Sequence, residues 1–342
     1  MGTRLSVVVA TYNRPVLITD LLQALATQSL PAEQFEVVVV DDGSTPPVRP
    51  ALQALALPYA LRVLEQANAG AAAARHAGVL AARGEVVVVT DDDMVVPPDF
   101  LEEHLRAHEN GYSLVLGAIV EDPRTTARQP VFHRMHAEQL ARERERAHAR
   151  WVPARGSAVC TGNVSFRRSD YLRVGGFDRT LARSEDRELG IRLEKAGARV
   201  AFARDARTIN HNDVDRREVW IQRNFLYGIY DRRIGQRHPD VESADPWHFL
   251  FEVNPVSASL ILVTVVAPVV GKVLARAALA AAEALDGLGW ERPALAGATL
   301  SYGLEYFRGV RHEAGSAWGA VRDLAAFLDK HTCHSRAAAA AV

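Results

Sequence analysis

Short apolar runs alternate with segments of helical periodicity in the N-terminal part of the chain. Residues 5–10 (LSVVVA), 35–40 (FEVVVV) and 85–90 (EVVVVT) are mostly apolar, which is typical of strands covered on both faces of a parallel sheet. Leucine and isoleucine recur at helical spacing over residues 17–25. A weaker strand and an Ala-rich helix are expected at residues 61–64 and 68–82. The pattern predicts an α/β fold with a mostly parallel sheet flanked by helices.

Polar segments follow three of these strands. The first strand leads into residues 11–15 (TYNRP), the second into 41–44 (DDGS), and the last into Asp91, Asp92 and Asp93. Because parallel strands end at one edge of the sheet, where such sheets bind ligands, we expect these segments to lie together. An acidic cluster there is costly to desolvate unless it meets a cation. Carboxylates suit Mn²⁺ or Mg²⁺, so the triplet predicts a metal that bridges the protein to a diphosphate.

Both acidic clusters of the sequence also have a purely structural explanation. Asp91 to Asp93 precede Pro97 and Pro98, so the triplet is compatible with a solvated turn that caps a helix. Glu185 and Asp186 precede a second helical pattern, where the helix macrodipole favours acidic residues in the first turn.

Six segments resemble successive motifs of the family 2 inverting nucleotide-sugar glycosyltransferases, in their order and spacing. They read VVVATYNRP, VVVVDDGST, NAGAAAARHAG, VVVVTDDDMVVPPDFLE, GNVSFRRSDYLRVGGFD and SEDRELGIRLEKAG. The resemblance covers about residues 4–212. It implies a GT-A fold, in which a nucleotide-binding α/β half is joined to an acceptor-binding half.

The resemblance implies a set of nucleotide-binding residues. Ala10, Thr11 and Tyr12 would line the base, with Tyr12 offering a stacking face. Asp42 would accept the N3–H of a uracil, as a carboxylate can. Arg75 would lie along the nucleotide, whereas without its motif it would be interpreted as a solvated helical arginine.

The resemblance also implies a metal site. Asp91 and Asp93 match the two acidic positions of the family's metal motif, and Asp92 between them is counted with the nucleotide-binding residues. Members of the family sometimes use the middle position, so the choice among the three stays open. His211 matches a histidine that completes the metal or diphosphate site, and an ordinary polar loop residue is the alternative. The bound ion would be Mn²⁺ or Mg²⁺.

The remaining implied residues concern catalysis. An inverting transfer needs one base that takes the proton of the acceptor hydroxyl, and Asp186 matches the family's base. Glu185 would position the acceptor or raise the pKa of Asp186 by like-charge proximity. Gly162 and Asn163, in the motif GNVSF, would contact the donor sugar or the acceptor.

Composition and the remaining motifs exclude several classes of protein. The chain has 40 basic and 41 acidic side chains, so it lacks the electrostatic pattern of a nucleic-acid-binding protein. Its 2 cysteines form no disulfide framework. No signal peptide precedes Leu5, so we expect a cytoplasmic location.

Five histidines lie in charged stretches and are predicted to be solvated: His104, His108, His133, His136 and His148.

The predicted organisation ends in an apolar extension. Residues 1–120 form the nucleotide-sugar-binding half, 121–252 the acceptor and base half, 253–334 the helical extension, and 335–342 a disordered tail.

The run at residues 256–271 contains Pro268 and is too short to favour membrane spanning. It is compatible with a peripheral anchor that has Lys272 and Arg276 at the headgroups, and equally with a buried helix or a homodimer contact.

The sequence therefore predicts a metal-dependent inverting glycosyltransferase with a nucleoside diphosphate donor, most simply UDP-linked, and an acceptor hydroxyl of unknown origin. One alternative is a sugar nucleotidyltransferase, although TYNRP lacks the glycines of a triphosphate-binding loop. Another is a catalytically silent scaffold that binds sugar nucleotides.

Overall fold

The chain forms two compact units in a computed structural model that describes residues 2–122, 129–146, 149–210 and 216–340. The first unit comprises residues 1–128 and 137–213, and the second comprises 129–136 and 214–342. The predicted boundary at residue 252 lies inside the second unit.

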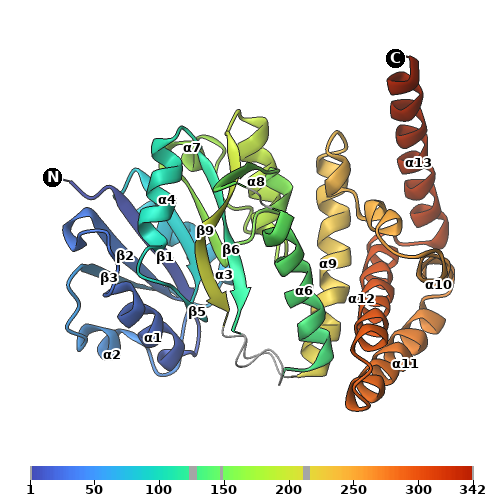
Figure 1. The fold of residues 1–342 in the computed structure, drawn as a ribbon, viewed down its shortest axis with the longest axis horizontal. Coiled ribbons are helices and arrows are strands. Elements are labelled where there is room, and N and C mark those ends of the chain that lie inside the picture. Colours follow the sequence, from blue (N-terminus) through green and yellow to red (C-terminus); the bar gives the residue numbers. More distant parts are fainter. Residues whose placement is uncertain (1, 123–128, 147–148, 211–215, 341–342) are drawn as a thin grey trace. The chain divides into compact units, whose positions relative to one another are not determined.

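A twisted sheet forms the centre of the first unit (Figure 1). Within the described residues it has nine strands in the order β3-β2-β1-β4-β8-β6-β9-β5, and β7 pairs with β9. The strands are β1 (Leu5–Thr11), β2 (Phe35–Asp41), β3 (Ala60–Glu65), β4 (Val86–Asp91), β5 (Met94–Val95), β6 (Leu114–Glu121), β7 (Trp151–Pro153), β8 (Asn163–Arg167) and β9 (Val200–Asn210).

The first four strands of this order are parallel, as the alternation of strand and helix predicts. In register, Thr11 lies opposite Asp41, and Ala10 lies opposite Asp91. The polar segments after β1, β2 and β4 therefore start at one edge of the sheet, which confirms their predicted proximity. Strand β8 then runs antiparallel between β4 and β6.

Helices cover both faces of the sheet because successive strand side chains point to opposite sides. Val7 and Val9 belong to the apolar cluster that includes side chains of α1 and α4, whereas Val8 belongs to the cluster that includes side chains of α3, α7 and α8. The described helices up to residue 195 are α1 (Pro15–Leu25), η1 (Ala32–Gln34), α2 (Arg49–Gln53), α3 (Ala71–Ala81), α4 (Phe100–Glu109), α6 (Val131–Arg146), η2 (Gly156–Ala158), α7 (Arg168–Arg173) and α8 (Glu185–Lys195). The first residues of α6, up to His136, belong to the second unit.

The second unit is helical. It contains α9 (Arg217–Arg237), η3 (Glu242–Ala244), η4 (Pro246–Phe251), α10 (Pro255–Val266), α11 (Pro268–Gly287), α12 (Glu291–Glu313) and α13 (Ala317–Ala340). Helices α9 and α12 touch through glycines, since a Cβ at Gly228 would lie 1.8 Å from the carbonyl oxygen of Tyr306. Helix α13 continues into the predicted disordered tail. None of the described helices combines the length and apolarity that crossing a bilayer requires.

The prediction that the histidines of α4 are solvated is wrong. His104 and His108 are 0% and 2% exposed. Both rings hydrogen-bond to the hydroxyl of Ser165 on β8, at 2.8 Å each, and Nε2 of His104 lies 2.9 Å from Oδ1 of Asn163. Burial lowers the pKa of His104 to about 4 and that of His108 to about 3. His133 is also buried, while the side chains of His136 and His148 lie outside the described residues.

These two histidines make the folded state sensitive to acid. A histidine with a lowered pKa stays neutral in the folded protein while the unfolded chain binds a proton below its ordinary pKa of 6.5. Stability therefore falls as the pH drops through 6.5 toward 4. The wild-type protein should lose unfolding free energy between about pH 7 and pH 5. The His108→Phe variant should lose about 2 kcal/mol less over the same range.

Urea denaturation at both pH values measures this difference. The exposed His312 provides the control, because His312→Asn should leave the loss unchanged. An equal loss in the wild type and in His108→Phe would mean that His108 is not the group responsible.

Candidate active site

The carboxylate of Asp42 joins two loops at the carboxyl edge of the sheet. Its Oδ1 accepts hydrogen bonds from Nε2 of Gln66 (2.7 Å) and the backbone N–H of Ala69 (2.9 Å), and its Oδ2 accepts one from the N–H of Gly70 (2.9 Å). A carboxylate has about four acceptor positions, so about one remains for a ligand such as the predicted uracil. Asp42 therefore fixes the loop that leads into α3. This loop ends at Gly70, whose φ of +89° favours glycine.

The loop after β1 presents an aromatic ring to solvent. Tyr12 is 50% exposed, so its face is available for stacking. Thr11 is buried, and its hydroxyl donates to Oδ2 of Asp92 at 2.7 Å. Ala10 lies beside Asp91 in the sheet register and is partly buried. Of the three residues predicted to line the base, Tyr12 is thus the most accessible.

The three aspartates after β4 point to different partners. Asp92 is buried, and its other oxygen lies 3.0 Å from Nη1 of Arg14. Asp93 Oδ2 lies 3.3 Å from the same Nη1. Asp91 Oδ1 instead pairs with Nη2 of Arg75 at 2.6 Å, and its side chain is 33% exposed. Both oxygens of Asp92 are therefore bonded within the protein, whereas Asp91 remains partly accessible.

Arg75 connects the two acidic clusters of the sequence. Its Nη1 lies 2.7 Å from Oε1 of Glu185, and its Nη2 contacts Asp91. Arg75 is buried, so its interpretation as a solvated helical residue is wrong. Helix α3 thus supplies one cation that links the end of β4 to the beginning of α8.

Asp186 lies beside this ion-pair network and is partly exposed. Its Oδ2 accepts from the backbone N–H of Thr161 (3.0 Å), and its Oδ1 accepts from that of Arg187 (2.8 Å). Burial of the carboxyl and the nearby charge of Glu185 raise its pKa to about 6, while these two hydrogen bonds and Arg75 oppose the rise. Asp186 can therefore exchange a proton near neutral pH.

Residues 160–163 connect Asp186, Asp91 and a pocket. A Cβ at Gly162 would lie 3.6 Å from Oδ2 of Asp91, so Gly162 borders the acidic cluster. The amide of Asn163 donates to the carbonyls of Ala118 (3.0 Å) and Ala206 (2.9 Å), and its Oδ1 accepts from Nε2 of His104 (2.9 Å). Both donors of Asn163 are therefore used inside the protein.

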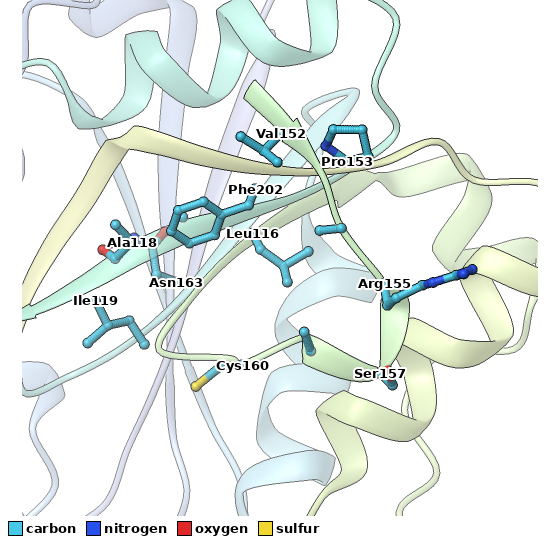
Figure 2. A pocket seen from close by; sticks show the side chains of 13 residues that line it. Leu116, Ala118, Ile119, Val152, Pro153, Arg155, Ser157, Cys160, Asn163 and Phe202 are labelled. Atoms are coloured by element: carbon cyan, nitrogen blue, oxygen red, sulfur yellow. Dashed lines mark hydrogen bonds between the residues drawn. The ribbon is translucent and has the colours of Figure 1, made fainter. Parts of the chain in front are cut away.

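The pocket has a volume of about 400 Å³ and lies between β6, β8, β9 and the segment that precedes Cys160. Figure 2 shows Cys160 on the loop below Leu116 and Phe202, with Val152 and Pro153 above them. Most of its lining side chains are apolar. The pocket begins at Cys160, next to the residue whose N–H binds Asp186, and it can hold an apolar part of a ligand.

One predicted site residue cannot be placed, and two residues of the site were not predicted from the sequence. His211 lies outside the described residues. Within the described ranges, no three His, Cys, Asp or Glu side chains are arranged as a metal site. Arg14, which holds Asp92 and Asp93, belongs to the motif TYNRP but was not singled out. Phe202 was missed because nothing in the sequence links it to Leu116.

The chain is similar in sequence to known glycosyltransferases. A validoxylamine A glucosyltransferase of Streptomyces hygroscopicus subsp. jinggangensis is 30% identical in an alignment of 232 residues that covers 59% of this chain and 54% of that protein. This chain thus spans about half the length of that relative.

Two solved structures show the same fold. The mannosyltransferase PcManGT of Pyrobaculum calidifontis, in complex with GDP-Man and Mn²⁺, has a TM-score of 0.58 at 22% identity over 87% of both chains. TarS of S. aureus, residues 1–349 in complex with UDP-GlcNAc, has a TM-score of 0.51 at 20% identity over 67% of both chains.

Residues 6–175 match the family described as Glycosyl transferase family 2. This match confirms the resemblance that the six motifs indicate, and the structural neighbours confirm the expected architecture. Over these residues the chain belongs to glycosyl transferase family 2, and its fold is of the GT-A type.

Proposed function

We propose that the chain is a metal-dependent inverting glycosyltransferase that moves a sugar from a nucleoside diphosphate, in the first instance UDP, to an acceptor hydroxyl. The observation that carries the proposal is the position of Asp186. Its carboxyl has a raised pKa, lies beside the ion pairs of Arg75, and is held by the segment that borders both Asp91 and the apolar pocket. Two proteins of similar fold, in complex with UDP-GlcNAc and GDP-Man, support the donor class.

The proposed metal ligands are Asp91 and Asp93, with His211 as a further ligand or diphosphate contact. Hard carboxylate oxygens suit Mn²⁺ or Mg²⁺, which proteins often bind through one or two carboxylates together with substrate phosphates. Asp92 fits this role less well because Thr11 and Arg14 already bond its oxygens. A bound cation would stabilise the charge of the departing nucleoside diphosphate.

The nucleotide would lie along the loops after β1 and β2. Tyr12 offers a face for the base, and Asp42 retains about one acceptor position for N3–H of uracil. In this proposal Ala10 and Thr11 form the floor under the base. Asp92 contributes by fixing the Thr11 hydroxyl, and Arg75 fixes Asp91 beside the diphosphate.

Asp186 would act as the base. Its carboxylate takes the proton of the acceptor hydroxyl as that oxygen attacks the anomeric carbon opposite the leaving diphosphate, so one displacement inverts the configuration. Burial, together with the charge of Glu185 that Arg75 holds nearby, keeps the pKa of Asp186 high enough for the carboxylate to be basic. The acceptor would enter through the pocket near Cys160. The cytoplasmic location and the homodimer contact stay predictions.

The metal proposal predicts the behaviour of two variants. Asp91→Ala and Asp93→Ala should each weaken UDP binding in Mn²⁺ by more than about tenfold, or 1.4 kcal/mol, because the cation loses a ligand. Isothermal titration calorimetry with and without Mn²⁺ measures this effect. The exposed Asp20 provides a control, and Asp20→Ala should bind normally. If both variants stay within about threefold of the wild type, the assignment is wrong.

The base proposal separates turnover from binding. Asp186→Asn keeps the shape but cannot take a proton, so UDP release from a UDP-sugar should fall by roughly 10²-fold or more at unchanged UDP affinity. Glu185→Gln should have a smaller effect. A fully active Asp186→Asn enzyme would place the base elsewhere, and pyrophosphate as the product would indicate a nucleotidyltransferase.

The pH dependence of turnover provides a further test of Asp186. Below its pKa of about 6 the carboxyl is protonated and cannot act as a base, so kcat/KM should decrease as the pH falls through this value. We expect the residual activity of Asp186→Asn to lack this acidic limb. An unchanged limb in the variant would assign the titration to another group.

A further inference from the structure

The second unit contains a polar pocket between α9, α11 and α12 that has no part in the proposed transfer reaction. Its volume is about 500 Å³, and its lining includes four cationic side chains against two acidic ones, Glu218 and Glu305. The cationic residues are Arg217, Lys272, Arg276 and Arg308. The lining therefore favours an anionic ligand.

Two of these cations are available to a ligand. Lys272 and Arg276 are one helical turn apart on α11, and both are exposed. Neither side chain makes a hydrogen bond or ion pair with any part of the chain that the structure describes. In contrast, Arg217 pairs with Glu283 at 3.2 Å and Arg308 pairs with Glu305. The pocket thus contains two cations that are held in ion pairs, Arg217 and Arg308. The other two, Lys272 and Arg276, can still bind a phosphate.

Glu305 indicates that the ligand also donates a hydrogen bond. Its residue is 1% exposed, and one carboxylate oxygen, Oε2, faces Arg308. The other oxygen, Oε1, is buried with no hydrogen-bond partner among the described residues. Such an oxygen costs free energy unless something donates to it. A phosphate next to a hydroxyl group would satisfy both the cations and Glu305.

Exposed apolar side chains lie at the end of α10 and in the first turns of α11, the helix that carries these cations. We define this apolar surface as Leu262, Val263, Val266, Val269, Val270 and Val273, which are between 39% and 76% exposed. No charged residue occurs between Glu252 and Lys272 in the sequence. Exposed apolar side chains gathered in this way mark an interaction surface.

The positions of the valines and cations along α11 match an interfacial helix. Val269, Val273 and Arg276 are separated by four and three residues, so they lie on one face of the helix, and Lys272 is next to Val273. A helix that lies in the surface of a bilayer buries its apolar side about 5–10 Å into the boundary between headgroups and acyl chains. With the valines at that depth, the long side chains of Lys272 and Arg276 can extend to the lipid phosphates.

We propose that this unit binds the surface of a membrane, with the apolar surface inserted and the pocket holding an anionic phospholipid headgroup that carries a hydroxyl. The phosphate accepts from Lys272 and Arg276, and the hydroxyl donates to Oε1 of Glu305. The inference goes beyond the proposed transfer reaction and does not depend on it, because lipid binding needs no donor sugar.

Flotation of the full chain with vesicles tests the proposal. Three lipid compositions separate its parts: phosphatidylcholine alone, an equimolar mixture with phosphatidylglycerol, and one with phosphatidylmethanol, which has the same charge but no headgroup hydroxyl. We expect binding in the order phosphatidylglycerol, phosphatidylmethanol, phosphatidylcholine. Equal binding to the two anionic lipids would overturn the role of Glu305.

Matched variants assign the binding to the pocket. Lys272→Gln with Arg276→Gln should weaken binding to phosphatidylglycerol vesicles about thirtyfold, since each cation near an anionic surface contributes about 1 kcal/mol. Arg292→Gln with Arg322→Gln removes the same charge from exposed positions outside the pocket and should have little effect. An unchanged circular dichroism spectrum and melting temperature confirm that each variant is folded. Equal losses in both pairs would overturn the pocket assignment.

Two further measurements identify a different ligand or partner if the unit does not bind a membrane. Stabilisation of the chain by glycerol 1-phosphate without any flotation would show that the pocket binds a soluble phosphate. A concentration-dependent dimer in sedimentation, abolished by Val266→Ser with Val269→Ser, would show that the apolar surface joins two copies of the chain. Either result without flotation overturns membrane binding.

Discussion

The buried guanidinium of Arg75 is the interaction on which the site depends. It faces Asp91 and Glu185, which come from different elements and lie 16 and 110 residues away in the sequence. Removing these charges from water costs several kcal/mol per ion, and short ion pairs with good geometry offset that cost. Without Arg75, the carboxylates at the end of β4 and the start of α8 would repel each other. The cation therefore allows two acidic clusters to share one edge of the sheet.

Behind this edge, a neutral hydrogen-bond network supports the segment that borders the base. Asn163 donates to two backbone carbonyls, and its oxygen lies against His104, which in turn contacts Ser165. Burial keeps both histidines of the network neutral, so it adds no charge next to the acidic cluster. The absence of a side chain at Gly117 is part of the same arrangement, because a Cβ there would lie 2.2 Å from Oδ1 of Asn163.

The charged residues of the helical unit are paired less completely than those around Arg75 in the first unit. In the first unit, two carboxylates pair with Arg75, whereas the pocket of the second unit has more cations than acids and one carboxylate oxygen that no described residue donates to. Charges that are paired within the protein and cations that are not have different consequences. The first preorganise groups for chemistry. The second gain free energy only when a ligand arrives.

The sequence by itself determined the four parallel strands of the N-terminal part, the edge at which they end and the family. Continuous apolar runs such as residues 5–10 and 35–40 can only be buried, and parallel pairing then places the polar residues after them at one edge. The two acidic clusters were also evident, because their position next to strand and helix patterns is a local property. These features need no knowledge of distant contacts.

Only the tertiary structure decided which side chains the charged and histidine residues contact. Histidines 104 and 108 lie among charged neighbours in sequence, yet they share the face of α4 that packs on β8, where Ser165 lies 61 and 57 residues away. Arg75 has the sequence context of a surface residue, but its partners come from β4 and α8. The strength of a buried hydrogen bond or ion pair depends on partners that are remote in the chain, so no local pattern reveals it.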